Sequence, residues 1–464
     1  MNGNLYARLA ARFPADRSRP VFEMLDGRTI SYGELEAGAG RLAALLKAKG
    51  VAVGDRVAVQ TPKSPEMVML YLAALKLGAA LLPLNTAYTK AEVDYFQADA
   101  EPALFVTDAV ALAAEAASLA PLEAAHEAAP GDLAAILYTS GTTGRSKGAM
   151  LSHQALGDNG QALTDAWGFT ADDTLLHALP IYHVHGLFIA IHCVLLAGAR
   201  MLWLAKFDES DVLAAMARSS VMMGVPTFYT RLVADPRLTR EAAAGMRLFI
   251  SGSAPLLPST FEAFEARTGQ RILERYGMSE AAIITTNPLE GERIAGSVGY
   301  PLAGVSLRVA DDGIVQIKGP SVTSGYWRNP EKTAEAFTAD GYFITGDVGR
   351  QDPDGRLWLS GRATDLIISG GLNVYPKEIE LVLDEMAGVV ESAVIGCPHP
   401  DFGEAVVAVV AGVGDEAAMI AAAREVLAAF KAPKRVFFVG DLPRNAMGKV
   451  LKAELRRTYA DTFR

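Results

Sequence analysis

Cysteine is scarce in this sequence: only Cys193 and Cys397 occur among 464 residues. Neither belongs to a CxxC pair, so the sequence predicts neither a disulfide framework nor a zinc site. Such sparing use of cysteine fits a reducing compartment, and we therefore expect a cytoplasmic protein.

Long apolar runs are also missing. The most apolar stretch, residues 186–199, is interrupted by His192 and is followed by Arg200. A membrane-spanning helix needs roughly 20 apolar residues, so this stretch predicts a buried helix and no membrane span. The first 19 residues have no apolar segment of the kind that a secretory signal contains.

An excess of positive charge is absent as well, since the formal net charge is −10. Acidic proteins repel phosphate backbones, so nucleic acid is not an expected partner. Residues 431–457 nevertheless contain eight Lys or Arg against two acidic residues. This stretch is either a solvated basic face or an end of the protein that handles phosphate groups, and composition favours the former.

The order of secondary-structure patterns indicates an α/β protein. The length suggests two to four structural units, and the hydrophobic content of 50% excludes a disordered chain. Buried strand patterns alternate with helical patterns over residues 31–99 and again over 133–276, which is typical of largely parallel sheets covered by helices. Short strands with Asp-Gly turns follow residue 299, and a mixed α+β pattern begins near residue 363.

The most specific local motif is YTSGTTGRSKG at residues 138–148, which directly follows a buried strand pattern. Its glycines allow tight turns and close approach to a ligand, while backbone N–H groups, hydroxyls and Lys147 can surround anionic oxygens. The alternative is an ordinary polar turn. The motif is not a Walker A loop, because Ser146 precedes the lysine and Gly148 follows it.

This motif resembles the phosphate loop of the adenylate-forming superfamily, which includes acyl-CoA synthetases, luciferases and the adenylation domains of peptide synthetases. Five further motifs of that family follow in order: SGSAP (251–255), ERYGMSE (274–280), GYFITGD (341–347), GRATDLIISGGLNVYP (361–376) and PRNAMGKV (443–450). The resemblance implies a large N-terminal domain (1–361) of layered sheets with helices and a small β-barrel-like subdomain. A small, mobile α+β C-terminal domain (362–464) is expected to follow it.

The resemblance also implies a role for each motif. Tyr276 would lie against adenine, Ser279 would reach a phosphate, and Glu280 with Thr139 would hold Mg²⁺. Asp347 would accept the ribose hydroxyls, with Arg362 as an added donor. The remaining residues expected around the nucleotide and coenzyme A are Ser140, Gly141, Thr142, Thr143, Gly144, Lys147, Gly252, Ser253, Ala254, Pro255, Glu274, Gly277, Met278, Gly370 and Gly371.

Lys449 is the expected catalytic cation. A carboxylate that attacks the α-phosphate of ATP builds negative charge, which a preplaced ammonium stabilises. The resemblance implies two steps: an acyl-adenylate forms first, and coenzyme A then attacks it after the C-terminal domain rotates. The hinge position holds Thr364, where the family commonly has Asp or Lys.

Segments around the expected acid pocket resemble malonyl-CoA synthetases. His183, His185, Arg231 and Arg275 make this pocket polar, and a short diacid needs a cation for its second carboxylate. Arg293 is a weaker candidate, and each arginine could instead serve a structural salt bridge. We expect His183 to position the substrate and not to act as a base, because the reacting carboxylate is already ionised.

Two departures from that subfamily fall in the pocket: Val184 replaces a typical Thr, and apolar residues 281–284, including Ile283, replace polar ones and Met. They predict tolerance of an alkyl group on the diacid. The sequence thus predicts a monomeric, ATP- and Mg²⁺-dependent ligase that joins malonate or an alkyl-malonate to coenzyme A. The alternative is a stand-alone adenylation enzyme that loads a carrier protein.

Overall fold

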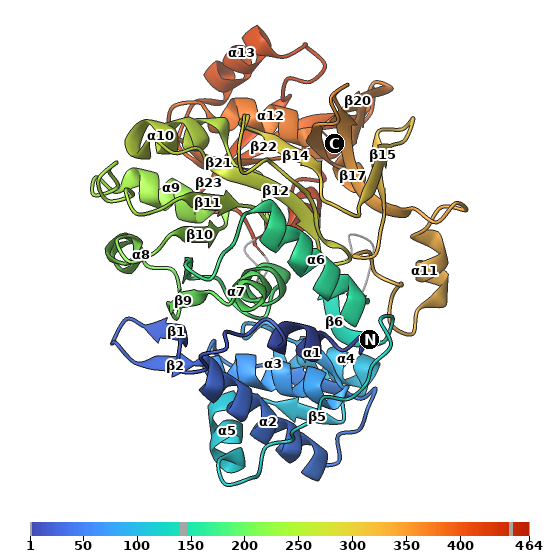
Figure 1. The fold of residues 1–464 in the computed structure, drawn as a ribbon. Helices are drawn as coiled ribbons and strands as arrows, with labels where there is room; N and C mark the ends of the chain where they lie inside the picture. The colour runs from blue at the N-terminus through green and yellow to red at the C-terminus, as the bar shows by residue number, and fades with distance from the viewer. Residues whose placement is uncertain (1, 140–145, 445–448, 464) are drawn as a thin grey trace. The chain divides into compact units, whose positions relative to one another are not determined.

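A computed structural model describes residues 2–139, 146–444 and 449–463 (Figure 1). The chain forms two compact units. The first comprises residues 1–307, 317–343 and 355–357, and the second comprises 308–316, 344–354 and 358–464. The second unit thus includes short segments that precede residue 362. The expected boundary after residue 361 stays a prediction, because compactness does not locate a hinge.

The first unit contains a five-stranded sheet in the order β5-β3-β4-β6-β7. Its strands are parallel except for β7, which runs antiparallel to β6. They are β3 (Arg56–Val59), β4 (Ala80–Pro83), β5 (Leu104–Val106), β6 (Leu133–Thr139) and β7 (Lys147–Ser152).

Successive strand residues point to opposite sides of the sheet. Both faces of this sheet carry apolar side chains, and helices cover both. Leu81 and Leu137 pack in the main core with α2 and α3, whereas Leu82 and Ile136 pack with α4 on the other face. Helices α2, α3 and α5 lie side by side (Figure 1). The helices of this part are α1 (Leu5–Ala10), α2 (Tyr32–Ala48), α3 (Pro65–Leu77), α4 (Lys90–Ala100) and α5 (Ala109–Ala116).

Local sequence signals explain where these helices begin. Ser31 caps α2, and the Glu34 carboxylate accepts a hydrogen bond from Ser31 N, so the two residues form a capping box. Ser64 caps α3 with Pro65 in its first turn, and Gly78 ends that helix at φ 85°.

A second sheet in the first unit has the order β14-β13-β12-β11-β10-β8-β9-β1-β2. Its strands from β1 to β12 are parallel apart from the edge strand β2, while β13 and β14 add an antiparallel meander. They are β1 (Pro20–Met24), β2 (Thr29–Ser31), β8 (Thr174–His177), β9 (Arg200–Trp203), β10 (Val221–Gly224), β11 (Leu248–Ser251), β12 (Leu273–Met278), β13 (Ala282–Thr286) and β14 (Ser297–Pro301).

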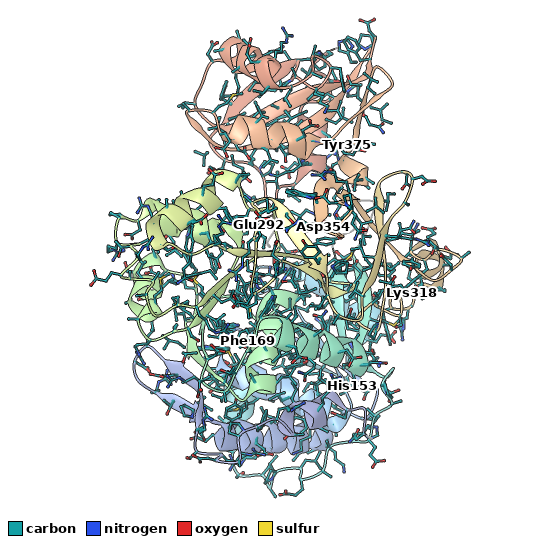
Figure 2. The ribbon with its side chains drawn as sticks, turned by 45° about the horizontal axis from the view of Figure 1, so that its top comes forward. His153, Phe169, Glu292, Lys318, Asp354 and Tyr375 are labelled. Atoms are coloured by element: carbon teal, nitrogen blue, oxygen red, sulfur yellow. The ribbon has the colours of Figure 1, made fainter. Side chains whose placement is uncertain are left out.

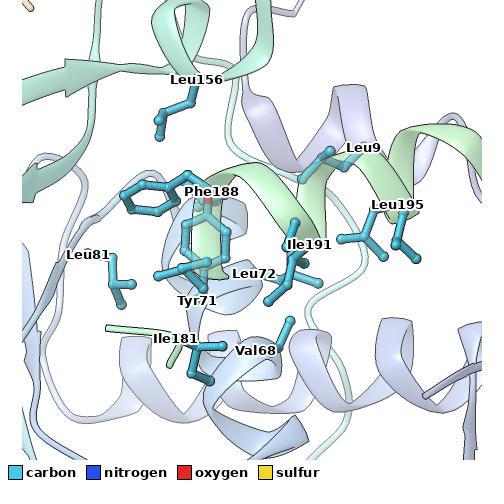
Figure 3. Packing of buried hydrophobic residues seen from close by; sticks show 14 of the residues in the cluster. Leu9, Val68, Tyr71, Leu72, Leu81, Leu156, Ile181, Phe188, Ile191 and Leu195 are labelled. Carbon is cyan, nitrogen blue, oxygen red and sulfur yellow. The ribbon is translucent and has the colours of Figure 1, made fainter. Parts of the chain in front are cut away.

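The main core lies between the two sheets. Helix α6 and the segment from 185 to 197 pack there against α1 and α3, while α8, α9 and α10 cover the outer face of the second sheet. The rings of Tyr71 in α3 and Phe188 pack at a tilt, with centroids 5.5 Å apart (Figure 3). The helices are α6 (His153–Ala166), α7 (Ile191–Ala197), α8 (Glu209–Met216), α9 (Pro226–Ala234), α10 (Pro258–Thr268) and α11 (Pro330–Glu335).

The buried segment 186–199 corrects one local prediction. Its first part is a π-helix, η1 (His185–Ala190), which continues as α7 (Ile191–Ala197). A π-helix widens the turn by one residue and is a rare element that frequently occurs at functional sites. The apolar sequence correctly predicts a buried helix. Apolar composition does not distinguish a π-helix from an α-helix, so the π-helical part was not predicted. The ring of His153 at the start of α6 (Figure 2) accepts a hydrogen bond from Leu5 N at 3.1 Å, which fixes α1 to α6.

The second unit contains two groups of strands. Strands β15 to β18 follow one another in sequence order, and a small sheet has the order β20-β19-β22-β21, with β23 beside β22. Its core holds Val394, Val406 and Val436 against α12 and α13. Its elements are β15 (Ser306–Val309), β16 (Ile314–Lys318), β17 (Phe343–Gln351), β18 (Leu357–Arg362), η2 (Ala363–Asp365), β19 (Ile367–Ser369), β20 (Leu372–Val374), α12 (Pro376–Asp384), β21 (Val389–His399), β22 (Gly403–Gly412), α13 (Glu416–Val426), β23 (Arg435–Val439) and α14 (Lys452–Thr458).

The mixed α/β class with a large N-terminal part and a small C-terminal α+β part is therefore confirmed. In the described part of the chain, no helix is both long and apolar enough to cross a membrane. Both cysteines are buried and unbridged.

Candidate active site

The motif at 138–148 joins β6 to β7 at one edge of the first sheet. Thr139 ends β6 and pairs with Lys147 at the start of β7. The ammonium of Lys147 lies 4.9 Å from the centre of the Tyr326 ring. Five predicted phosphate-binding residues, Ser140, Gly141, Thr142, Thr143 and Gly144, lie outside the described residues.

Glu280 stands at the tip of the hairpin between β12 and β13. Gly277 belongs to a bulge in this hairpin, where a Cβ atom would lie 2.0 Å from the carbonyl oxygen of Ala282. The Glu280 side chain is buried, and its Oε1 lies 3.4 Å from the Thr139 hydroxyl and accepts a hydrogen bond from Tyr326 at 3.2 Å. Two oxygen-bearing side chains from separate sheets, Thr139 and Glu280, therefore meet here.

The rest of the ERYGMSE motif lines the same hairpin. Tyr276 is buried in β12, whereas Met278 and Ser279 are half-buried at the turn. Glu274 is buried, and its Oε1 accepts a hydrogen bond from Gly296 N at 2.9 Å. Burial raises the pKa of Glu274 to about 8, and hydrogen bonds from Gly296 and Leu256 oppose this shift. The hydrogen bond from Leu256 joins Glu274 to the residue that directly follows the SGSAP segment.

The SGSAP segment turns sharply after β11. Ser253 has φ +73°, an unusual value for a residue other than glycine. At Gly252, a Cβ atom would lie 2.4 Å from the Arg275 guanidinium, so any larger residue here would force this side chain to shift. Ala254 and Pro255 follow as exposed residues.

Arg275 is a buried cation that no carboxylate among the described residues neutralises. It follows Leu273 on the face of β12 that packs into the main core. Its Nη2 approaches the Ser253 hydroxyl at 3.5 Å, while its Nε has no hydrogen-bond partner in the described residues. Burial lowers the pKa of Arg275 to about 9. A buried charge without a partner is costly, so this position is suited to an anionic ligand.

Two histidines accompany Arg275. The Nδ1 of His185 lies 3.4 Å from the Ser253 hydroxyl, and its Nε2 is buried without a partner in the described chain. Burial, followed by the charge of Arg275, lowers the pKa of His183 to about 4 and that of His185 well below its usual value. Both rings are therefore neutral at pH 7. The apolar Val184 and Ile283 are buried in the same core cluster.

The other two arginines are placed differently. Arg231 lies on α9 with 63% of its side chain exposed, and its Nη1 is 3.7 Å from Glu209. Arg293 donates to the carbonyl oxygens of Pro288, Leu289 and Arg271, which is the structural alternative considered for it. Of these three arginines, only Arg275 is both buried and without an acidic partner in the described residues.

The second unit brings together another set of predicted residues. The Nε of Arg362 lies 2.7 Å from Oδ1 of Asp347, and its Nη1 donates to the Thr345 carbonyl at 3.1 Å. The pKa of Lys449 is lowered by the removal of its ammonium from water and by the positive charge of Arg362, while Asp365 and Asp347 oppose the shift. These residues form the Asp347 cluster: Asp347, Arg362, Asp365 and Lys449.

Gly370 and Gly371 form the turn between β19 and β20, with φ values of +58° and +79°. Both are exposed, and Gly370 N donates to the Phe402 carbonyl at 2.8 Å. Thr364 lies in η2 next to Asp365, which pairs with Arg456 at 2.7 Å. The predicted hinge residue is thus adjacent to an ion pair with the last helix.

Sequence reasoning missed several residues around these sites. Tyr326 and Thr323 support Glu280, the latter through a 2.6 Å hydrogen bond from its backbone N–H to the Glu280 carbonyl. Lys63 donates to the backbone carbonyl of His177, and the ring of His177 contacts the carbonyl of Gly186 in η1. The sequence around Lys63 has the composition of a loop and carries no motif, so no local signal could have identified it.

Comparisons with known proteins agree with this arrangement. Residues 6–327 match the model of the AMP-binding enzyme family, and residues 378–449 match that of the AMP-binding enzyme C-terminal domain. A malonate–CoA ligase of Arabidopsis thaliana is 33% identical over 93% of this chain and 85% of its own. A sulfoacetate–CoA ligase of Cupriavidus necator is 35% identical over 97% and 96%.

Solved structures give the same result. The crystal structure of ATP-bound MatB from Rhodopseudomonas palustris has a TM-score of 0.97 and 51% identity, with all of both chains covered. The expected resemblance to adenylate-forming enzymes, and among them to a ligase for malonate, is therefore confirmed. Because the first family match alone spans more than half of the sequence, the chain belongs to the AMP-binding enzyme family.

Proposed function

We propose that this protein is an ATP-dependent ligase that converts malonate and coenzyme A to malonyl-CoA, AMP and pyrophosphate. The observation that carries the choice of acid is Arg275, a buried guanidinium with no carboxylate partner in the described chain and with an unpaired Nε. Malonate has a second carboxylate to fill that position, whereas a monocarboxylic acid would leave the charge uncompensated.

The reaction has two steps, adenylation of malonate and formation of the thioester. One carboxylate oxygen of malonate attacks the α-phosphorus of ATP, which forms the malonyl-adenylate bond and breaks the bond to the departing pyrophosphate. The sulfur of coenzyme A then attacks the acyl carbon, forms the thioester and releases AMP, while the thiol proton passes to solvent. The distal carboxylate of malonate stays at Arg275 throughout, with His185 Nε2–H as a second donor.

The tautomer of His185 follows from its neighbours. The Ser253 hydroxyl accepts from Arg275 and can donate its own proton to His185 Nδ1. The neutral ring then carries its hydrogen on Nε2, the atom that has no partner among the described residues. His183 holds the substrate from the same segment. We propose Arg231 as a second contact, since its exposed pair with Glu209 is weak enough to open.

Glu280 and Thr139 fit a magnesium site, because a carboxylate and a hydroxyl oxygen are ligands that Mg²⁺ prefers. When bound, the ion would neutralise charge on the phosphate oxygens. Lys147 and the segment 139–144 would surround the same phosphates. Tyr276, Gly252, Ala254 and Pro255 would face the adenine.

Changing Glu280 to Gln should raise the Mg²⁺ concentration needed for half-maximal adenylation by about tenfold, because a neutral amide binds the ion more weakly. The measurement is pyrophosphate release at increasing Mg²⁺. Glu290, an acidic residue in the loop after β13, provides a control as Glu290→Gln with an unchanged Mg²⁺ requirement. An unchanged requirement in the Glu280 variant would contradict the assignment.

For the second unit we propose that Asp347 and Arg362 bind the ribose and that Lys449 stabilises the attack on the α-phosphate. A domain of residues 362–464 would rotate about Thr364 between the two steps, and Gly370 and Gly371 would then contact coenzyme A. The Asp347–Arg362 distance of 2.7 Å supports joint binding of the hydroxyls. A cytoplasmic monomer remains our expectation.

We predict that methylmalonate is adenylated with a kcat/KM within about fivefold of malonate, since a buried methyl group adds only about 1 kcal/mol and Val184 and Ile283 are apolar. Pyrophosphate release with malonate, methylmalonate and succinate measures this. A kcat/KM for methylmalonate more than about fivefold below that for malonate would contradict the prediction.

The overall reaction is tested by product analysis with malonate, ATP and coenzyme A. We expect AMP, pyrophosphate and malonyl-CoA in equal amounts. A phosphopantetheinylated carrier protein in place of coenzyme A tests the alternative acceptor. Preferred acylation of the carrier, or ADP in place of AMP, would overturn the proposal.

A further inference from the structure

Lys63 is a half-buried lysine with no role in the proposed reaction. It lies in the segment that joins β3 of the five-stranded sheet to α3. Its Nζ donates to the carbonyl oxygens of His177 at 2.8 Å and Leu204 at 2.6 Å, and it lies 4.5 Å from the centre of the Trp203 ring. No carboxylate among the described residues pairs with it.

These contacts satisfy an ammonium group and fasten two strands. An ammonium has three donors, and here two carbonyls and the face of an indole receive them. His177 ends β8, and Leu204 directly follows Trp203 at the end of β9. Lys63 therefore connects the carboxyl ends of both strands to the segment after β3 of the first sheet. The His177 ring also stacks on Trp203, with centroids 5.1 Å apart and an interplanar angle of 5°.

His177 extends this network to the π-helix. Its Nε2 lies 3.0 Å from the carbonyl oxygen of Gly186, so Nε2 must carry the hydrogen. Gly186 follows His185, and a Cβ atom at Gly186 would lie 1.9 Å from the Pro180 oxygen. The first turn of η1 is therefore packed tightly and held from one side by His177.

The network ends at the acid pocket. His185 in that first turn reaches the Ser253 hydroxyl at 3.4 Å, and this hydroxyl lies 3.5 Å from Arg275 Nη2. A continuous series of contacts thus leads from Lys63 through His177, Gly186 and His185 to Arg275. A shift of about 1 Å in a positioning group can cost up to about 100-fold in rate.

We propose that Lys63 is a positioning residue for the acid pocket, which it acts on through His177 and the first turn of η1 without touching the substrate. The inference rests on the proposed function, since it assumes that Arg275 and His185 receive the distal carboxylate. It predicts that loss of Lys63 weakens malonate binding and leaves ATP binding intact.

The test is the variant Lys63→Met, which keeps much of the length of the side chain but removes its donors. We expect KM for malonate to rise about tenfold while KM for ATP and kcat stay within about twofold. Lys76→Met is the matched control: Lys76 is a buried lysine on α3, 4.8 Å from the Tyr6 ring. Its KM for malonate should not change.

A second variant keeps the inference testable if Lys63→Met does not fold. His177→Phe keeps a ring against Trp203 but removes the donor to Gly186, and it should raise KM for malonate to a similar extent. Where both variants fold, the double variant should be no worse than the more affected single one, because both act through one network.

The outcomes separate this inference from the proposed function. Equal changes in KM for malonate and ATP, or an additive double variant, would overturn the positioning role. If Arg275→Met loses malonate selectivity while Lys63→Met and His177→Phe keep a normal KM for malonate, the pocket stands and only the role of Lys63 fails. If the wild-type protein does not use malonate, the proposed function fails first.

Discussion

Replacing Arg275 by methionine is expected to lower kcat/KM for malonate by about 10²- to 10³-fold. Hydrogen bonds to a charged group contribute about 1.5–3 kcal/mol, and the guanidinium can offer more than one to the distal carboxylate. Acetate has no distal carboxylate, so its turnover should fall far less. The measurement is pyrophosphate release for both acids at several concentrations.

The same variant should not be less stable than the wild type. A buried guanidinium without a carboxylate partner costs free energy of folding, and methionine fills similar space without charge. We expect an equal or higher Tm in the absence of substrates. Arg293→Met is the control, since Arg293 donates to three carbonyl oxygens and its loss should lower Tm without changing acid selectivity. Loss of malonate and acetate turnover to the same extent in Arg275→Met would contradict the assigned role.

Lys449→Ala should lower the rate of adenylate formation by about 10²- to 10³-fold, because a preplaced charge that stabilises a transition state is worth about 3–4 kcal/mol. Thioester formation from supplied malonyl-adenylate and coenzyme A should continue. In that step the thiol attacks the acyl carbon, and no bond to the α-phosphorus forms or breaks. Single-turnover measurements of each half-reaction test this difference.

Lys431→Ala is the matched control for this variant. Lys431 belongs to the same basic stretch and pairs with Glu378 at 2.6 Å, outside the Asp347 cluster. Both half-reactions should stay near the wild-type rate in this control. Equal loss of both half-reactions in Lys449→Ala would contradict its role as the adenylation cation.

Local sequence signals predict much of the fold. The capping box of Ser31 and Glu34 marks the start of α2, and Gly78 marks the end of α3. The alternation of residues such as Leu81 and Leu82 between two helix layers follows from the strand period alone. These features depend on neighbouring residues, so sequence reasoning can reach them.

Features that depend on distant residues were not predicted. The π-helix at His185–Ala190 has the same apolar composition as an ordinary helix. The partners of Lys63, the carbonyls of His177 and Leu204, lie more than 100 positions away in the sequence. The residue type of Arg275 suggested a carboxylate ligand, but its lack of a protein partner becomes visible only once the sheet is assembled.

The most direct test of the account is the ratio of kcat/KM for malonate to that for acetate in the wild-type protein, measured as ATP-dependent pyrophosphate release. An unpaired buried arginine in the acid pocket predicts a ratio of about 10² or more, because acetate leaves the charge uncompensated. A ratio near or below one would contradict the claim that Arg275 selects a diacid.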